Sequence, residues 1–183
     1  IITAPKVTGA SYTWRDFAPV ANVISIPFTL VARSNTPIKN FDDFLAQAKA
    51  NPGKLTYASP GHGTSTQMAA DAMAAAAAIK IEEVPYQGGG PAVTALLSGI
   101  VDTALATPSI VMSQVKAGKL VTLAVTGDQR FAPSSEVPTM REKGVDVAVV
   151  SRYGFYMPRD TPPEIVKKFA DAVESAVKDK HYA

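Results

Sequence analysis

The chain has 183 residues, of which 46% are hydrophobic and 19% are charged, and its formal net charge is +2. This balance is ordinary for a globular protein, and the length allows one domain or two small ones. The small charge and the scattered lysines and arginines argue against a nucleic-acid partner, and the absence of cysteine excludes disulfides, thiolate metal sites and cysteine nucleophiles.

Membrane and export signals are not visible in the sequence. No apolar run reaches the roughly 18–20 residues that span a bilayer, and the alanine-rich stretch 68–79 is interrupted by Asp71. The chain begins Ile1-Ile2-Thr3, without the charged and apolar regions of a signal peptide. We expect that such a segment was removed or that the chain is a fragment of a longer protein.

The first elements are predicted between residues 20 and 51. An apolar, β-branched stretch contains Pro27, which predicts one strand at 20–25 and a second at 28–32. Asn40 then precedes two aspartates, which is typical of a helix N-cap followed by an acidic first turn. This helix should bury one stripe, made of Phe41, Phe44, Leu45 and Ala48.

Strands and helices then alternate up to residue 126. The predicted strands are 55–58, 81–84, 101–106 and 120–126, and the predicted helices are 65–78, 91–97 and 110–115. Alternation of this size indicates an α/β fold with a parallel sheet that is covered by helices on both faces.

After Gly127 the alternation ends. A loop at 130–138, a helical turn at 139–143 and a strand within 145–157 are expected, and the change of composition near 127–138 is the best candidate domain boundary. The last helix should begin at a capping box formed by Thr161 and Glu164. Its apolar face would consist of Ile165, Val166, Phe169, Val173, Ala176 and Val177.

Two glycine-rich loops follow the first two strands of the alternating region. They are Ser59–Thr66 and Gln87–Pro91. Glycine lets backbone N–H groups approach a ligand, and a helix N-terminus leaves several N–H groups unpaired and carries partial positive charge. Two such loops on neighbouring strands would form a pocket for an anion without any fixed cationic side chain.

Hydroxyl groups increase the number of donors near these loops. Ser59, Thr64 and Ser65 belong to the first loop, and Thr107 and Ser109 follow the third strand. In a parallel sheet all three strand ends lie at one edge, where α/β sheets bind ligands. Both loops could equally serve only as structural turns between a strand and a helix.

Nucleotide binding and catalysis find less support. The first loop lacks the Lys of a Walker A motif and the third Gly of a dinucleotide fingerprint. A triad could combine His62 with Ser59 or Ser65 and with Asp71 or Asp102, but no G-x-S-x-G motif is present. We expect His62 at the pocket rim or exposed to solvent.

Two further groups of polar residues are expected to have no chemical role. Glu82 and Glu83 have no carboxylate partner at a fixed spacing and should be solvated. The only other histidine, His181, lies near the C-terminus, so a histidine metal cluster is not expected.

Segments spread over nearly the whole chain resemble, in order, the solute-binding proteins of tripartite tricarboxylate transporters, often called the Bug family. These segments are Asp16–Ala21, Asn51–Ser59, Gly61–Thr64, Val84–Ala92, Lys116–Leu120, Leu123–Thr126 with Arg130, Val137–Thr139 with Glu142 and Gly144, and Pro158 with Thr161 and Pro162.

The resemblance implies a periplasmic, monomeric protein with a two-lobed, type II periplasmic-binding-protein-like fold of the Venus flytrap kind. Such proteins are not enzymes and use no cofactor or metal. They close over a small organic carboxylate (a di- or tricarboxylate, an acidic amino acid or an aromatic acid), held by backbone amides, hydroxyls and water, and deliver it to membrane permease subunits. Carried over by position, the ligand-binding residues would be Gly61, Gly63 and Thr64, with weaker assignments at Ser59, Ser65, Thr107 and Ser109.

Two departures from the family pattern are visible. Gln67 stands where family members usually have His, and the first lobe of the family begins upstream of Ile1. Residues 17–127 would then be the parallel-sheet second lobe, and 1–16 with 128–183 the remnant of an incomplete first lobe. Two other hypotheses stay open: an α/β enzyme that uses His62 as a base at the same loops, and a chain that binds nothing because part of its pocket is missing.

Overall fold

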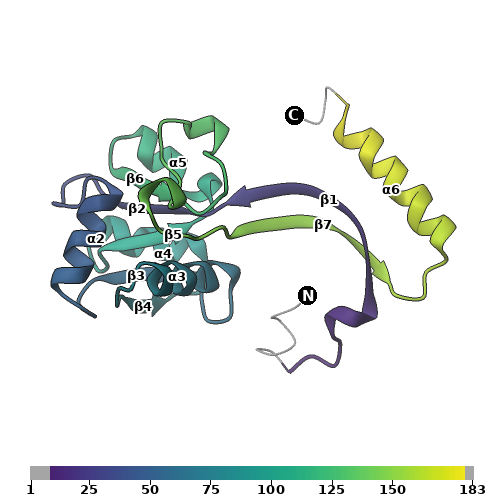
Figure 1. The fold of residues 1–183 in the computed structure, drawn as a ribbon, viewed down its shortest axis with the longest axis horizontal. Helices are drawn as coiled ribbons and strands as arrows, with labels where there is room; N and C mark the ends of the chain where they lie inside the picture. The colour runs from purple at the N-terminus through teal and green to yellow at the C-terminus, as the bar shows by residue number, and fades with distance from the viewer. Residues whose placement is uncertain (1–8, 180–183) are drawn as a thin grey trace. The chain divides into compact units, whose positions relative to one another are not determined.

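The computed structural model describes residues 9–179 and divides them into two compact units (Figure 1). One unit is the continuous segment Ile26–Ser151. The other combines the segment that ends at Ser25 with the segment that begins at Arg152. The assignment of 17–127 to a second lobe, and of 1–16 with 128–183 to a first lobe, remains a prediction.

The larger unit is built on a five-stranded sheet with the order β4-β3-β5-β2-β6. Its strands are β2 (Thr29–Arg33), β3 (Thr56–Ser59), β4 (Glu82–Pro85), β5 (Thr103–Ala106) and β6 (Leu120–Val125). Strand β3 is parallel to β4 and β5, whereas β2 is antiparallel to β5 and β6. The α/β class is confirmed, but the predicted parallel sheet is in fact mixed. The alternation of strands and helices specifies crossovers only from β3 onward, so it could not reveal that the earlier strand β2 inserts in the opposite direction.

Helices cover both faces of this sheet, as predicted (Figure 1). They are α2 (Phe41–Ala50), α3 (Ser65–Ala76), α4 (Gly89–Ser98) and α5 (Pro108–Lys116). Helices α2 and α3 pack in one buried cluster, and α4 and α5 pack in a second. Strand β2 serves both clusters, with Leu30 in the first and Val31 in the second, because successive side chains of a strand point to opposite faces.

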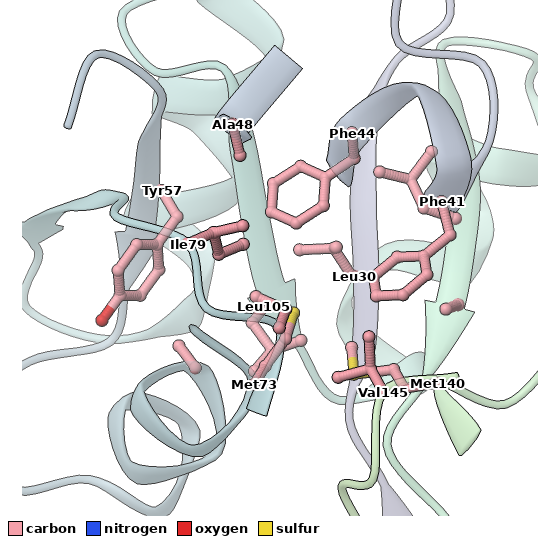
Figure 2. Packing of buried hydrophobic residues seen from close by; sticks show 14 of the residues in the cluster. Leu30, Phe41, Phe44, Ala48, Tyr57, Met73, Ile79, Leu105, Met140 and Val145 are labelled. Carbon is pink, nitrogen blue, oxygen red and sulfur yellow. The ribbon is translucent and has the colours of Figure 1, made fainter. Parts of the chain in front are cut away.

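The first cluster contains the largest buried side chains (Figure 2). Phe41 and Phe44 of α2 are fully buried and stack with their ring centroids 5.8 Å apart. The predicted cap of this helix is confirmed, since the Asp43 amide donates to the Asn40 side chain at 2.9 Å. Burial of each phenylalanine contributes about 2–3 kcal/mol.

The smaller unit contains a two-stranded sheet of β1 (Phe17–Pro27) and β7 (Val150–Pro158), which lie side by side (Figure 1). The 3₁₀ turn η1 (Trp14–Asp16) precedes β1, and two more, η2 (Ala132–Ser134) and η3 (Arg141–Lys143), lie in the larger unit. Strand β1 was predicted to end before Pro27, but it includes this residue, and Phe28 separates it from β2.

Helix α6 (Pro163–Val177) follows β7. Its predicted capping box is wrong: Pro162 is the N-cap, and the Thr161 hydroxyl donates to the Pro158 carbonyl at 2.7 Å. Thr161 lies one residue too early for a cap, because the helix begins at Pro163. Of the predicted apolar face, Val173 is buried and Phe169 packs edge-on against Phe155, with ring centroids 5.3 Å apart. No helix within residues 9–179 is long and apolar enough to cross a membrane.

Candidate functional site

The two glycine loops lie next to each other at one edge of the sheet. Strands β4, β3 and β5 are neighbours and parallel, so their carboxyl ends meet there, each followed by the N-terminus of a helix. The Gly88 amide donates to the Pro60 carbonyl at 3.2 Å, which joins the two loops directly. The predicted proximity of the loops is therefore confirmed.

Gly61 is required where the first loop passes the end of β4. Its φ is +127°, a backbone conformation that side-chain-bearing residues rarely adopt, and a Cβ placed on it would lie 3.4 Å from the Tyr86 carbonyl oxygen. The glycine lets the first loop stay close to the second.

A carboxylate that was predicted to be solvated instead lies beneath the first loop. The side chain of Glu83 is only 14% exposed. Its Oε1 accepts the Ser59 hydroxyl at 2.5 Å, and its Oε2 accepts the Gln67 side-chain amide at 2.8 Å. His62 Nδ1 lies 3.0 Å from Oε2 of the same carboxylate. The expectation was wrong because it considered only carboxylate pairs, whereas the partners of Glu83 come from β3, the loop and α3.

The same network uses the amide groups that were expected to face a ligand. The Gly61 amide donates to the Ser59 hydroxyl at 3.2 Å, and the Gly63 amide donates to Gln67 Oε1 at 2.6 Å. Ser59 is fully buried. These three predicted residues thus take part in the internal structure of the loop.

Thr64 is the cap of helix α3. Its hydroxyl donates to the Gly61 carbonyl at 2.8 Å and accepts the Gln67 amide at 3.3 Å. Sequence reasoning missed Glu83 and gave Gln67 no role. The spacing of Thr64 and Gln67, three residues apart at a helix start, was the available signal, because a side chain at that position can reach back to the preceding loop.

Several amide donors at this edge have no hydrogen-bond partner within residues 9–179. They belong to the first turns of α3 and α4, and they are the N–H groups of Thr64, Ser65, Thr66, Gly89 and Gly90. At the start of α5, Thr107 is the N-cap residue, and its hydroxyl lies 3.2 Å from that of Ser109. Three helix N-termini, each with partial positive charge, therefore meet at one sheet edge.

Fixed cationic side chains are nearly absent from this part of the chain. Between residues 55 and 115 the only lysine or arginine is Lys80, and its carbonyl accepts the Gly53 amide at the opposite edge, before β4 begins. An anion at the loops would be held by main-chain dipoles and hydroxyl groups, which is the chemistry of helix N-termini.

The charge of Glu83 affects its titratable neighbours. Burial, followed by the negative charge of Glu83, raises the pKa of Asp71 in α3. Burial and then the charges of Glu83 and Asp71 raise the pKa of Tyr57 above its ordinary range. The Tyr57 hydroxyl is buried, and within the described chain it has no hydrogen-bond partner.

No catalytic triad is assembled from the candidate residues. Ser59 and His62 both contact Glu83, so the acid stands between the serine and the histidine, and the His62 side chain is 68% exposed. Asp102 accepts the amide and hydroxyl of Thr56, at the far end of β3 from the loop. Within residues 9–179 no group of three acidic or histidine side chains could hold a metal ion.

Comparison with known proteins identifies the family to which this chain is similar. The family described as "Tripartite tricarboxylate transporter family receptor" matches residues 1–183. The UPF0065 protein in the gbd 5' region of Cupriavidus necator is 35% identical over 168 residues, which cover 92% of this chain and 51% of that protein. The chain thus spans about half the length of this curated relative.

Two solved structures share the fold. A TctC solute binding protein from Polaromonas, without ligand, superposes with a TM-score of 0.84 at 29% identity, over 98% of this chain and 62% of that one. MatC from Rhodopseudomonas palustris with bound malate superposes with a TM-score of 0.79 at 28% identity, over 94% and 59% of the two chains.

Proposed function

This chain belongs to the tripartite tricarboxylate transporter receptor family, and from that premise we propose that it captures a small organic carboxylate and presents it to a membrane permease. The proposed location is the periplasm. One of the neighbouring solved structures is a TctC solute binding protein, and the other, MatC, holds malate. A dicarboxylate of this size is therefore our first candidate ligand.

The observation that carries the proposal is the meeting of three helix N-termini at the carboxyl edge of β4, β3 and β5. Each helix N-terminus is equivalent to about half a positive charge, so together they can attract a carboxylate without a lysine or arginine. The amides of Thr64, Ser65, Gly89 and Gly90 are the proposed donors.

The other proposed site residues contribute in two ways. Thr107 and Ser109 offer hydroxyl groups at the start of α5. Three residues shape the first loop instead: Ser59 donates to Glu83, Gly61 donates to Ser59, and Gly63 donates to Gln67. Glu83 acts as a positioning residue for the loop in this proposal.

The sharpest test removes one amide proton without disturbing the helix. Ser65 is the first residue of α3, where proline is tolerated, and Thr64 before it is extended (φ −77°, ψ 155°), as a residue before proline must be. Ser65→Pro removes both the amide proton and the hydroxyl, whereas Ser65→Ala removes only the hydroxyl. Calorimetric titration of the full-length protein with malate, other di- and tricarboxylates, acidic amino acids and aromatic acids provides the measurement.

We expect saturable binding of at least one acid by the unmodified protein. Ser65→Ala should weaken it by about 3- to 10-fold, and Ser65→Pro by a further 10-fold or more, because a hydrogen bond to a charged group is worth about 1.5–3 kcal/mol. Equal affinities of the two variants would contradict the role of the amide. Absence of saturable binding for every acid would contradict the function itself, and circular dichroism of each variant controls for loss of α3.

A further inference from the structure

A cavity lies at the opposite edge of the same sheet from the glycine loops. Strand β2 runs against β5, so its last residue, Arg33, lies near the start of β5 and far from the glycine loops. The cavity has a volume of about 380 Å³, at the lower end of the range of small-molecule sites. It is lined by Arg33, Ser34, Asn35, Leu97, Gly118 and Lys119.

Arg33 has donors that the protein does not use. Its Nε is buried and has no hydrogen-bond partner within residues 9–179. Neither Arg33 nor Lys119 takes part in any ion pair of this described range. A buried donor of a charged group without a partner costs stability, and a guanidinium presents its N–H groups in a fork that matches the oxygens of a carboxylate or phosphate.

The two helices that end beside the cavity do not need Arg33 as a cap. At the end of α4, the Ile100 amide donates to the Ala95 carbonyl at 3.0 Å. At the end of α5, the Lys119 amide donates to the Gln114 carbonyl at 3.0 Å. At both helix ends, carbonyls of the last turn thus accept hydrogen bonds from backbone amides that follow the helix.

The absence of a side chain at Gly99 makes room for the guanidinium of Arg33. The φ of Gly99 is +82°, and a Cβ added there would collide with the terminal nitrogen and the central carbon of the Arg33 guanidinium. The arginine head therefore packs directly on the backbone that ends α4. Its position is set by packing and not by an acidic partner.

The cationic side chains of the lining favour an anion. Arg33 and Lys119 contribute two positive charges, against about one negative charge from the two helix C-termini together. Asp102, at the same end of β5, adds a carboxylate, but its Oδ2 already accepts the Thr56 amide and hydroxyl at 2.8 Å. Lys39 adds a further cation, with its Nζ 2.5 Å from the Ser34 carbonyl. The acidic group next to it, Asp43, accepts the Lys39 amide at 2.9 Å.

We propose that this cavity binds a small oxyanion, whose phosphate or carboxylate oxygens contact the guanidinium of Arg33 and the ammonium of Lys119. Ser34 and Asn35 also line the cavity and offer further polar groups for the ligand. The site is separate from the glycine loops and does not depend on the proposed carboxylate capture there.

The test follows the Arg33 Nε–H signal by ¹H–¹⁵N NMR during titration of the full-length protein with inorganic phosphate, with malonate, and with sodium chloride of matched ionic strength. The signal is assigned by its loss in Arg33→Gln. We expect a saturable shift with phosphate or malonate and none with chloride, and the tighter of the two identifies the class of ligand.

Three variants distinguish anion binding at this cavity from a general attraction of anions to positive charge on the protein. Binding to the variants is followed on the backbone amides of 33–35 and 118–119. Arg33→Gln should weaken binding by about 10-fold or more, and Lys119→Gln should weaken it several-fold. Lys119→Gln also tests the site if Arg33→Gln fails to fold. Lys116→Gln removes an equal charge from the last turn of α5 outside the cavity lining, and should change affinity less than 2-fold. Ser65→Pro should leave this titration unchanged.

The proposal would be overturned by a linear, unsaturated response to both anions, or by equal losses in Lys119→Gln and Lys116→Gln. A loss of phosphate or malonate binding in Ser65→Pro would assign that binding to the glycine loops instead.

Discussion

At the scale of single residues, the first glycine loop depends on Glu83. One carboxylate accepts from Ser59 and Gln67 and contacts His62, and these partners then fix the amides of Gly61 and Gly63. A nearly buried carboxylate is tolerated only when its oxygens are hydrogen-bonded, and here both oxygens are. The loop is therefore shaped before any ligand arrives.

Burial, and then the negative charge of Glu83, make the ionised form of Asp71 unfavourable. Because the pKa of Asp71 is raised in the folded protein, protonation favours the folded state, and this contribution is lost as the pH rises through the folded pKa. Asp71→Asn should therefore raise the midpoint of thermal unfolding at pH 7. The gain should shrink as the pH falls toward about 4, the ordinary pKa range of an aspartate, and disappear below it, where the carboxyl becomes neutral in both states.

Asp160→Asn is the matched control, because it removes an exposed carboxylate from the turn before α6. Thermal unfolding of the three proteins between pH 4 and pH 8 gives the comparison. A stabilisation by Asp71→Asn that persists unchanged at pH 4, or that Asp160→Asn reproduces, would refute the electrostatic explanation.

At the scale of elements, the close approach of β1 and β7 depends on one glycine. A Cβ added to Gly154 would collide with the Ala21 carbonyl oxygen of β1. The neighbouring atom is backbone, which cannot move aside without separating the strands. Glycine inside a strand is otherwise unfavourable, and it is common where another backbone comes close.

Gly154→Ala should therefore destabilise the smaller unit. We expect a loss of about 1–3 kcal/mol in the free energy of unfolding, the usual cost of overpacking. Urea denaturation gives this value, and Arg152→Ala, an exposed change in the same strand, should stay within about 0.5 kcal/mol of the original. If the Gly154→Ala protein were as stable as the original, the close approach of β1 and β7 would not depend on this glycine.

At the scale of the whole molecule, the two units differ in how much apolar surface they bury. Segment Ile26–Ser151 contains two buried clusters, on the two faces of its sheet. In the described part of the other unit, Val173 is the only buried apolar side chain, and Tyr153, Phe155 and Tyr156 of β7 are about half exposed. Burial of apolar area is the main source of stability, so the larger unit should be the more stable one.

Native-state hydrogen exchange of the 183-residue chain tests this difference. Amides of β5, at the centre of the sheet, should exchange only on global unfolding, whereas amides of β7 between Arg152 and Pro158 should exchange at least about 10-fold faster through local opening. Leu105→Ala should speed exchange in β5 and leave β7 unchanged. Equal protection of β5 and β7 would instead indicate one cooperative unit.

Much of the fold and part of the site could be predicted from the sequence. The Asn40 cap, the alternation of strands and helices, and the two glycine loops at neighbouring strand ends depend on residues close together in the chain, so local patterns indicate them. The ordered family segments also predicted the receptor family that matches the whole chain.

Other features were decided only by the tertiary structure. The reversed direction of β2, the burial of Glu83 beneath the first loop and the unpartnered Nε of Arg33 all depend on which distant segments become neighbours. A strand's direction and a side chain's burial are set by long-range packing, because the same local sequence can pair on either side and face either protein or water. For that reason the sequence located the loops, whereas the arrangement of their hydrogen bonds required the three-dimensional structure.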